Sequence, residues 1–153
     1  MMTEFDLENT IGYLINRCSI LLKSELTHRF NQAGYDVTPE EWVILNRLWE
    51  QDGMSQNELA RTTLKDKTTI VRFLDQMSKK QLIIRKNSSE DARVKEIYLT
   101  PAAHTLKNKL IPIVQELLAD CSVNIKPTQV SITISVLHEI EQNLLQIESK
   151  AIN

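Results

Sequence analysis

Residues 66–81 of the chain, DKTTIVRFLDQMSKKQ, predict one amphipathic helix with a buried face and a presented face. Helical spacing places four apolar side chains on one face, Ile70, Phe73, Leu74 and Met77. It places four polar or charged side chains on the other face, Thr68, Arg72, Asp75 and Lys79. Asp66 stands at the N-cap position, where its carboxylate can accept from the free amides of the first turn. The stretch is therefore predicted to present polar and basic groups to a partner.

The sequence on either side of this helix predicts a helix-turn-helix followed by a two-stranded wing. Upstream, Ser55 and Glu58 have the spacing of a capping box, which predicts a short helix over 55–63. Downstream, residues 82–87 and 93–100 flank the polar, turn-forming segment SSEDA. This pattern predicts a strand, a loop and a second strand.

Long helices are predicted at both ends of the chain. Apolar residues recur at helical spacing over 5–32, and Ala33-Gly34 ends this stripe. The residue pairs 38–39, 100–101 and 126–127 each place a proline at a first helical position. The terminal helices have broad apolar faces outside the central module, so a homodimer is expected to bury them.

Together these patterns predict a mainly α protein with a minor β component, a winged helix-turn-helix with long terminal helices. We expect a single domain over residues 1–153. Within it, residues 38–100 form the winged helix-turn-helix module, and residues 5–34 and 101–150 form the dimerisation helices.

Charge is distributed unevenly along the chain. The net charge of −2 and the pI near 5.9 are not those of a typical nucleic-acid binder. Residues 65–95, however, carry nine Lys and Arg against four Asp and Glu, which leaves nine against 16 elsewhere from totals of 18 and 20. A basic face on an acidic body is expected of a surface that meets phosphate, and a merely solvated charged face is the alternative.

Composition and motifs limit the other function classes. No apolar run approaches the ~18 residues that span a bilayer, and the acidic N-terminus does not resemble a secretion signal. Two cysteines fit an intracellular chain with free thiols, so a soluble, cytoplasmic protein is expected. The sequence shows no Gly-rich phosphate loop, nucleophile elbow or metal motif. We therefore expect no enzyme activity, no metal and no cofactor.

Residues 38–100 resemble the MarR-type winged helix-turn-helix transcription regulators. The segments TPEEWVILNRLWE, SQNELA and KDKTTIVRFLDQMSKKQLIIRKNSSEDARVKEIYLT follow the family's order. The most specific part is the wing motif, in which Asp91-x-Arg93 precedes Ile97-x-Leu99-Thr100. The resemblance implies a dimeric regulator, in the commoner case a repressor, that reads a pseudo-palindromic operator in double-stranded DNA. It also implies that a small-molecule effector modulates this binding.

Two positions depart from the family pattern. Gln81 and Ala103 stand where such sequences commonly have glycine. A left-handed Gln81 would cost roughly 1 kcal/mol, unless the turn is different. The replacement at Ala103 concerns the start of the following helix.

The resemblance assigns the helix 66–81 to the major groove and the wing 86–95 to the minor groove. Base reading is expected from hydroxyls and a guanidinium in the first turns of the helix, Thr68, Thr69 and Arg72. In the wing, which also contributes Lys86, Arg93 is expected to enter the minor groove while Asp91 orients it. Phosphate contacts are expected from five further residues, Ser55, Gln56, Lys65, Lys67 and Lys79.

Three alternatives concern other groups. Cys18 could make the chain a thiol-based redox regulator, as in the family's peroxide-sensing branch, but a small buried hydrophobe is favoured for Cys18 and Cys121. Trp42 and Trp49 could line an effector pocket, although core packing is favoured for both. The fold could also serve as a protein-interaction module without DNA binding, against which the retained basic residues argue.

Overall fold

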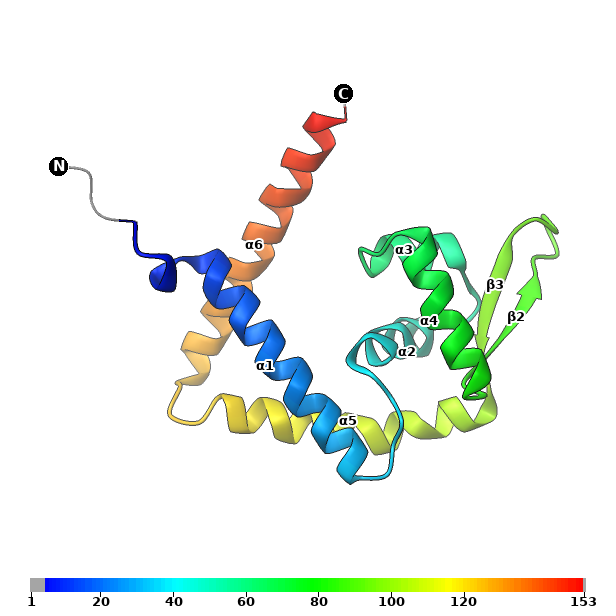
Figure 1. Ribbon diagram of the computed structural model, residues 1–153, viewed down its shortest axis with the longest axis horizontal. Coiled ribbons are helices and arrows are strands. Elements are labelled where there is room, and N and C mark those ends of the chain that lie inside the picture. Colours follow the sequence, from blue (N-terminus) through cyan, green and yellow to red (C-terminus); the bar gives the residue numbers. More distant parts are fainter. Residues whose placement is uncertain (1–4, 153) are drawn as a thin grey trace. The chain divides into compact units, whose positions relative to one another are not determined.

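The computed structural model describes residues 5–152, which form two compact units that meet in sequence after Val114. In chain order, its elements are η1 (Leu7–Asn9), α1 (Ile11–Gln32), α2 (Pro39–Glu50), β1 (Met54–Ser55), α3 (Gln56–Thr62), α4 (Lys67–Lys79), β2 (Ile83–Asn87), β3 (Lys95–Leu99), α5 (Pro101–Cys121) and α6 (Pro127–Ala151) (Figure 1). The protein is thus mainly helical with one small sheet, which confirms the predicted fold class.

The sheet has three antiparallel strands in the order β1-β3-β2. The hairpin of β2 and β3, which pairs Ile83 with Leu99 and Asn87 with Lys95, confirms the predicted wing. Strand β1 adds a third strand, so the prediction of two strands was incomplete. Its two residues are too few to show an alternating pattern in the sequence. Gly53 leads into β1 with φ +79°, and a Cβ there would lie 2.8 Å from the Tyr98 ring.

Helix starts follow the predicted capping residues. Thr38 Oγ1 accepts from the Glu41 amide at 3.2 Å, and Glu41 Oε2 accepts from the Thr38 amide at 3.0 Å. Ser55 and Glu58 form the same reciprocal pair at the start of α3. Helix α1 begins at Ile11 because Thr10 accepts from the amide of the first turn, so the predicted start at residue 5 was wrong.

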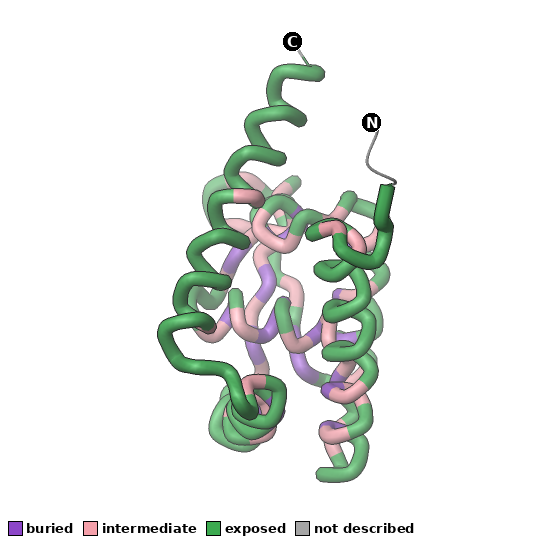
Figure 2. Tube along the Cα trace, turned by 90° about the vertical axis from the view of Figure 1, so that its left-hand side faces the viewer, coloured by how far each residue is buried: buried purple, intermediate pink, exposed green. Residues whose placement is uncertain are grey.

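The core of the first unit is built from one face of each helix and of the sheet. Figure 2 shows the buried residues gathered in this part of the chain. Among the described residues, the largest fully buried apolar side chains are Phe30, Ile44, Leu45, Leu48, Leu59, Ile70, Leu74, Met77, Ile83, Ile97 and Leu110. Burial of such a side chain stabilises the fold by about 1.5–3 kcal/mol. Three of the four apolar residues predicted for α4 are in this core, and the fourth, Phe73, is half-buried.

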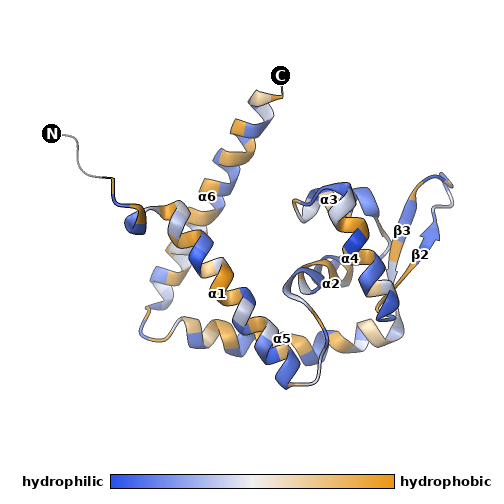
Figure 3. Ribbon diagram, viewed as in Figure 1, coloured by the Kyte–Doolittle hydropathy of each residue, from blue (hydrophilic) through white to orange (hydrophobic). Residues whose placement is uncertain are grey.

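Both units leave large apolar side chains exposed. In the first unit many of them lie on α1, including Ile11, Leu14, Ile15, Ile20 and Leu21. In the second unit α6 has no buried residue at all, and its exposed apolar residues include Ile132, Ile134, Leu144 and Ile147. Figure 3 shows hydrophobic and hydrophilic residues alternating along both helices.

Candidate nucleic-acid interface

Helix α4 begins at the predicted cap. Asp66 Oδ1 accepts from the Thr69 amide at 2.8 Å, and Asp66 Oδ2 accepts from the Thr69 hydroxyl at 2.9 Å. The backbone hydrogen bond of Thr69, and then its hydroxyl, lower the pKa of Asp66. The Thr69 hydroxyl therefore donates to the cap, and only its acceptor capacity is free for a base edge.

The polar face of α4 is exposed along its whole length. Thr68, Arg72, Asp75 and Lys79 are all exposed, which confirms the predicted division into a buried and a presented face. The Arg72 guanidinium lies 5.0 Å from the centroid of the Phe73 ring, and Lys65 Nζ lies 5.2 Å from the same ring. Cation–π contacts with Phe73 therefore hold both cations on the surface beside α4.

Arg85 of β2 links the elements that present this face. Its Nε donates to Gln56 Oε1 of α3 at 3.0 Å, and its guanidinium pairs with Asp75 Oδ1 of α4 at 2.8 Å. Gln56, which we predicted to contact phosphate, already uses its carbonyl oxygen in this link. Sequence reasoning counted Arg85 only as part of the basic cluster, since its partners lie far away along the chain.

The wing presents an arginine that an acidic side chain holds in place. Residues 88–94 join β2 to β3, and the Ser88 amide donates to the Val94 carbonyl at 2.9 Å. The Arg93 side chain is 91% exposed, and its Nε and Nη2 donate to the two Asp91 carboxylate oxygens, each at 3.1 Å. These side-chain hydrogen bonds, with one from the Arg93 amide, lower the pKa of Asp91. The forked pair fixes the direction of the guanidinium.

The other predicted contact residues lie on the same elements. Lys67 is exposed in the first turn of α4. Ser55 is half-buried, and its hydroxyl oxygen caps α3. Lys86 of β2 is exposed, with its Nζ 4.8 Å from the centroid of the Tyr98 ring. The structure thus places the predicted contact residues on β1, α3, α4, β2 and the loops that adjoin them.

The two tryptophans contact each other, and Trp42 also contacts Phe30. The Trp42 ring centroid lies 5.9 Å from that of Phe30 and 5.7 Å from that of Trp49. Trp49 Nε1 donates to the Ala103 carbonyl oxygen at 3.1 Å. Both tryptophans are half-buried.

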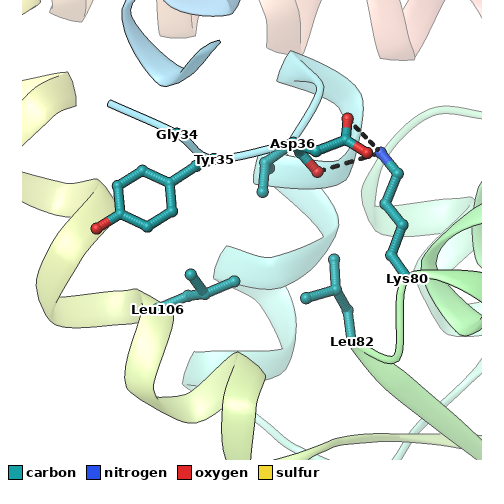
Figure 4. A pocket seen from close by; sticks show the side chains of 7 residues that line it. Gly34, Tyr35, Asp36, Lys80, Leu82 and Leu106 are labelled. Carbon is teal, nitrogen blue, oxygen red and sulfur yellow. Dashed lines mark hydrogen bonds and ion pairs between the residues drawn. The ribbon is translucent and has the colours of Figure 1, made fainter. Parts of the chain in front are cut away.

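A separate cavity of about 320 Å³ lies in the first unit. Figure 4 shows it beside the loop between α1 and α2, at the end of α4, with Gly34, Tyr35, Asp36, Val37, Lys80, Leu82 and Leu106 as its lining. Neither tryptophan is among these residues. The cavity combines apolar walls with the charged groups of Asp36 and Lys80.

The cysteines, a possible metal site and possible membrane-spanning helices remain to be described. Cys18 and Cys121 are both exposed in the chain, so the expectation that they are buried was wrong for the chain by itself. Cys18 lies on the part of α1 that carries several exposed apolar side chains. Within residues 5–152, His, Cys, Asp and Glu form no group that could hold a metal ion. No helix in the described part of the chain is long and apolar enough to cross a membrane.

A capped, exposed second helix followed by a β-hairpin with an arginine in its loop defines a winged helix-turn-helix protein. Residues 37–95 match the model of the MarR family. This match confirms, over these residues, the resemblance seen in the sequence.

Solved structures share this fold over nearly their whole length. A MarR transcriptional regulator from Methanosarcina mazei Go1 is 22% identical, with a TM-score of 0.80, and the match covers 90% of this chain and 97% of that one. The S. aureus MepR–DNA complex is 24% identical, with a TM-score of 0.77 and coverage of 90% and 98%. Bordetella bronchiseptica BpsR, whose DNA binding is regulated by 6-hydroxynicotinic acid, is 16% identical, with a TM-score of 0.82 and coverage of 91% and 98%.

Proposed function

We propose that the chain is a dimeric, sequence-specific DNA-binding transcription regulator, acting as a repressor on a pseudo-palindromic operator. Residues 38–100 serve as the DNA-binding module, with α4 in the major groove and the wing in the minor groove. The long terminal helices serve as the dimerisation region. A small-molecule effector modulates the affinity for DNA.

One observation carries this proposal, the pairing of a presented helix with an oriented wing arginine. An exposed guanidinium such as that of Arg72 can bind guanine O6 and N7 through two hydrogen bonds. Arg93, which Asp91 holds by two hydrogen bonds, suits the concentrated negative potential of a narrow minor groove. Because Arg72 and Arg93 can both contact bases or the groove, the module can bind with a preference for sequence in addition to its attraction to phosphate.

The proposed dimer rests on the exposed apolar side chains of the terminal helices. Large contiguous apolar surface is uncommon on a monomer and marks an interface. A two-fold axis would relate two copies of α4, as needed to read half-sites about 34 Å apart. This arrangement fits a pseudo-palindromic operator.

The proposed effector rests on similarity to ligand-responsive structures. BpsR is regulated by 6-hydroxynicotinic acid, and a structure of PcaV from Streptomyces coelicolor contains its natural ligand. An effector that binds one spacing of the two recognition helices better than another would shift the population toward it. Its differential affinity for the two states sets the size of the shift.

The proposed function can be tested by selecting DNA fragments with the purified protein. The selection is done at about 0.15 M salt, which screens non-specific electrostatic binding. We expect enrichment of a two-fold symmetric motif by the unmodified protein. Arg93→Ala should lose that enrichment and remain a dimer, while Arg93→Lys, which keeps the charge without the fork, should recover only part of it. Equal enrichment by Arg93→Ala would refute the role of the wing, and no enrichment by the unmodified protein would favour a protein-interaction module.

A further inference from the structure

Lys80 is the C-cap residue of α4, and its ammonium group points toward the start of α2. Its Nζ donates to Glu41 Oε2 at 2.9 Å and to the carbonyl oxygen and Oδ1 of Asp36, each at 3.2 Å. Figure 4 shows the two bonds to Asp36. Three acceptors match the three N–H donors of an ammonium group. A phosphate could engage Lys80 only if one of these bonds broke.

Glu41, which accepts from Lys80, is a fully buried carboxylate. Its side chain has no solvent exposure, and its Oε2 also accepts from the Thr38 amide at the start of α2. Its Oε1 has no hydrogen-bond partner among the described residues. A buried carboxylate is costly unless a cation pairs with it, and Lys80 supplies that charge. The pair therefore constrains the distance between the start of α2 and the end of α4.

The charge state of Lys80 supports the same constraint. Partial burial of the amine opposes the charged form, but the hydrogen bond and charge of Glu41, followed by those of Asp36, raise the pKa of Lys80 above its usual value. Lys80 is thus protonated at neutral pH.

The end of α4 also sets the start of the wing. The Gln81 amide donates to the Ser78 carbonyl at 3.0 Å, and the Leu82 amide donates to the Met77 carbonyl at 2.9 Å. These two bonds form a Schellman motif, which turns the chain directly into β2. Leu82 is buried. A displacement of Lys80 would therefore move the last turn of α4 and the first residue of the hairpin together.

We infer that Lys80 is a positioning residue of the DNA-binding surface, which holds the end of α4 against the start of α2 and does not contact phosphate. The inference rests on the proposed function. It distinguishes Lys80 from its neighbour Lys79, whose exposed side chain makes no hydrogen bond or ion pair within residues 5–152. The two adjacent lysines thus have different roles.

The salt dependence of DNA binding distinguishes these roles. Each phosphate contact contributes about 0.9 to the slope of log K against log salt, so Lys79→Met should lower the slope by about that amount. Lys80→Met should weaken binding by about tenfold, since a small misplacement of a binding group is costly, with the slope unchanged. A loss of slope in Lys80→Met equal to that in Lys79→Met would overturn the inference.

A second variant distinguishes loss of positioning from loss of the folded state. Lys80→Met leaves the Glu41 carboxylate buried without its cation, whereas Lys80→Met combined with Glu41→Gln removes that charge. The double variant should recover most of the unfolding midpoint and still bind DNA as weakly as Lys80→Met. Recovery of full DNA affinity in the double variant would overturn the positioning role.

Amide hydrogen exchange tests the same contact without DNA. Loss of the Lys80 contacts should speed exchange of the amides of residues 80–82 by about tenfold, while Lys79→Met leaves them unchanged. Unchanged protection in both Lys80 variants would overturn the inference. If exchange responds but the unmodified protein binds no DNA, the proposed function fails and the role of Lys80 in holding α4 stands.

Discussion

Gln81 occupies a backbone conformation that favours glycine. Its φ is +59°, at the C′ position of the Schellman motif, and its side chain is exposed. Gln81→Gly should raise the free energy of unfolding by about 1 kcal/mol, since glycine adopts this conformation without the Cβ penalty. Urea unfolding measures the change. Gln76→Gly, in the interior of the same helix, should destabilise instead, and a gain there would contradict the explanation.

Asp66 makes the stability of α4 depend on pH. The folded-state pKa of Asp66 is lowered by the Thr69 hydrogen bonds. Its stabilising contribution is therefore present above the unfolded pKa near 3.9, and it is lost as the pH falls through the lower folded pKa. Asp66→Asn keeps a neutral acceptor, so the stability difference between the two proteins should narrow below about pH 4. Urea unfolding from pH 7 to pH 3 tests this, and a constant difference would count against it.

At the scale of elements, we expect different residues of α4 to contact bases and phosphates. Arg72→Ala should cost about 1–3 kcal/mol of binding to the selected operator and relax the preference at one position. Lys67→Ala should weaken binding to all sequences by a similar factor and lower the salt slope by about 1. Binding titrations with operator and scrambled duplexes measure both effects. A uniform loss in Arg72→Ala would assign that residue to phosphate instead.

The turn before β1 is a second test at this scale. Gly53 combines a φ of +79° with a Cβ position 2.8 Å from the Tyr98 ring. Gly53→Ala should therefore lower the free energy of unfolding by at least about 1 kcal/mol, because the backbone is strained and the ring must shift. Gly12, where a Cβ meets nothing within 4 Å and the residue lies inside α1, is the matched control. Gly12→Ala should be neutral or stabilising in the same urea experiment.

At the scale of the whole molecule, the apolar surfaces of α1 and α6 should hold the proposed dimer together. Leu21 and Ile134 are 62% and 52% exposed in the single chain. Leu21→Glu and Ile134→Glu should each raise the dimer dissociation constant by at least about tenfold, since an interface would bury an unpaired carboxylate. Sedimentation equilibrium measures this constant. Leu64→Glu, at a residue that is 70% exposed in the turn before α4, should leave it unchanged.

The amino-acid sequence by itself determined the local elements and the face that α4 presents. The caps at Thr38, Ser55 and Asp66 act over three residues, and the stripe of α4 repeats with the helical period, so both can be recognised from neighbouring residues. The hairpin was recognisable for the same reason, as two short runs with a polar turn between them.

Only the tertiary structure decided the third strand and the roles of individual charges. Lys80 contacts Glu41 across 39 positions, and Arg85 contacts Gln56 across 29. Such partners share no period or spacing, so counting bases over residues 65–95 treated these two like the exposed lysines. Their roles depend on which acceptors the folded chain brings within hydrogen-bond distance, because a half-buried cation binds the nearest carboxylate or carbonyl in place of water.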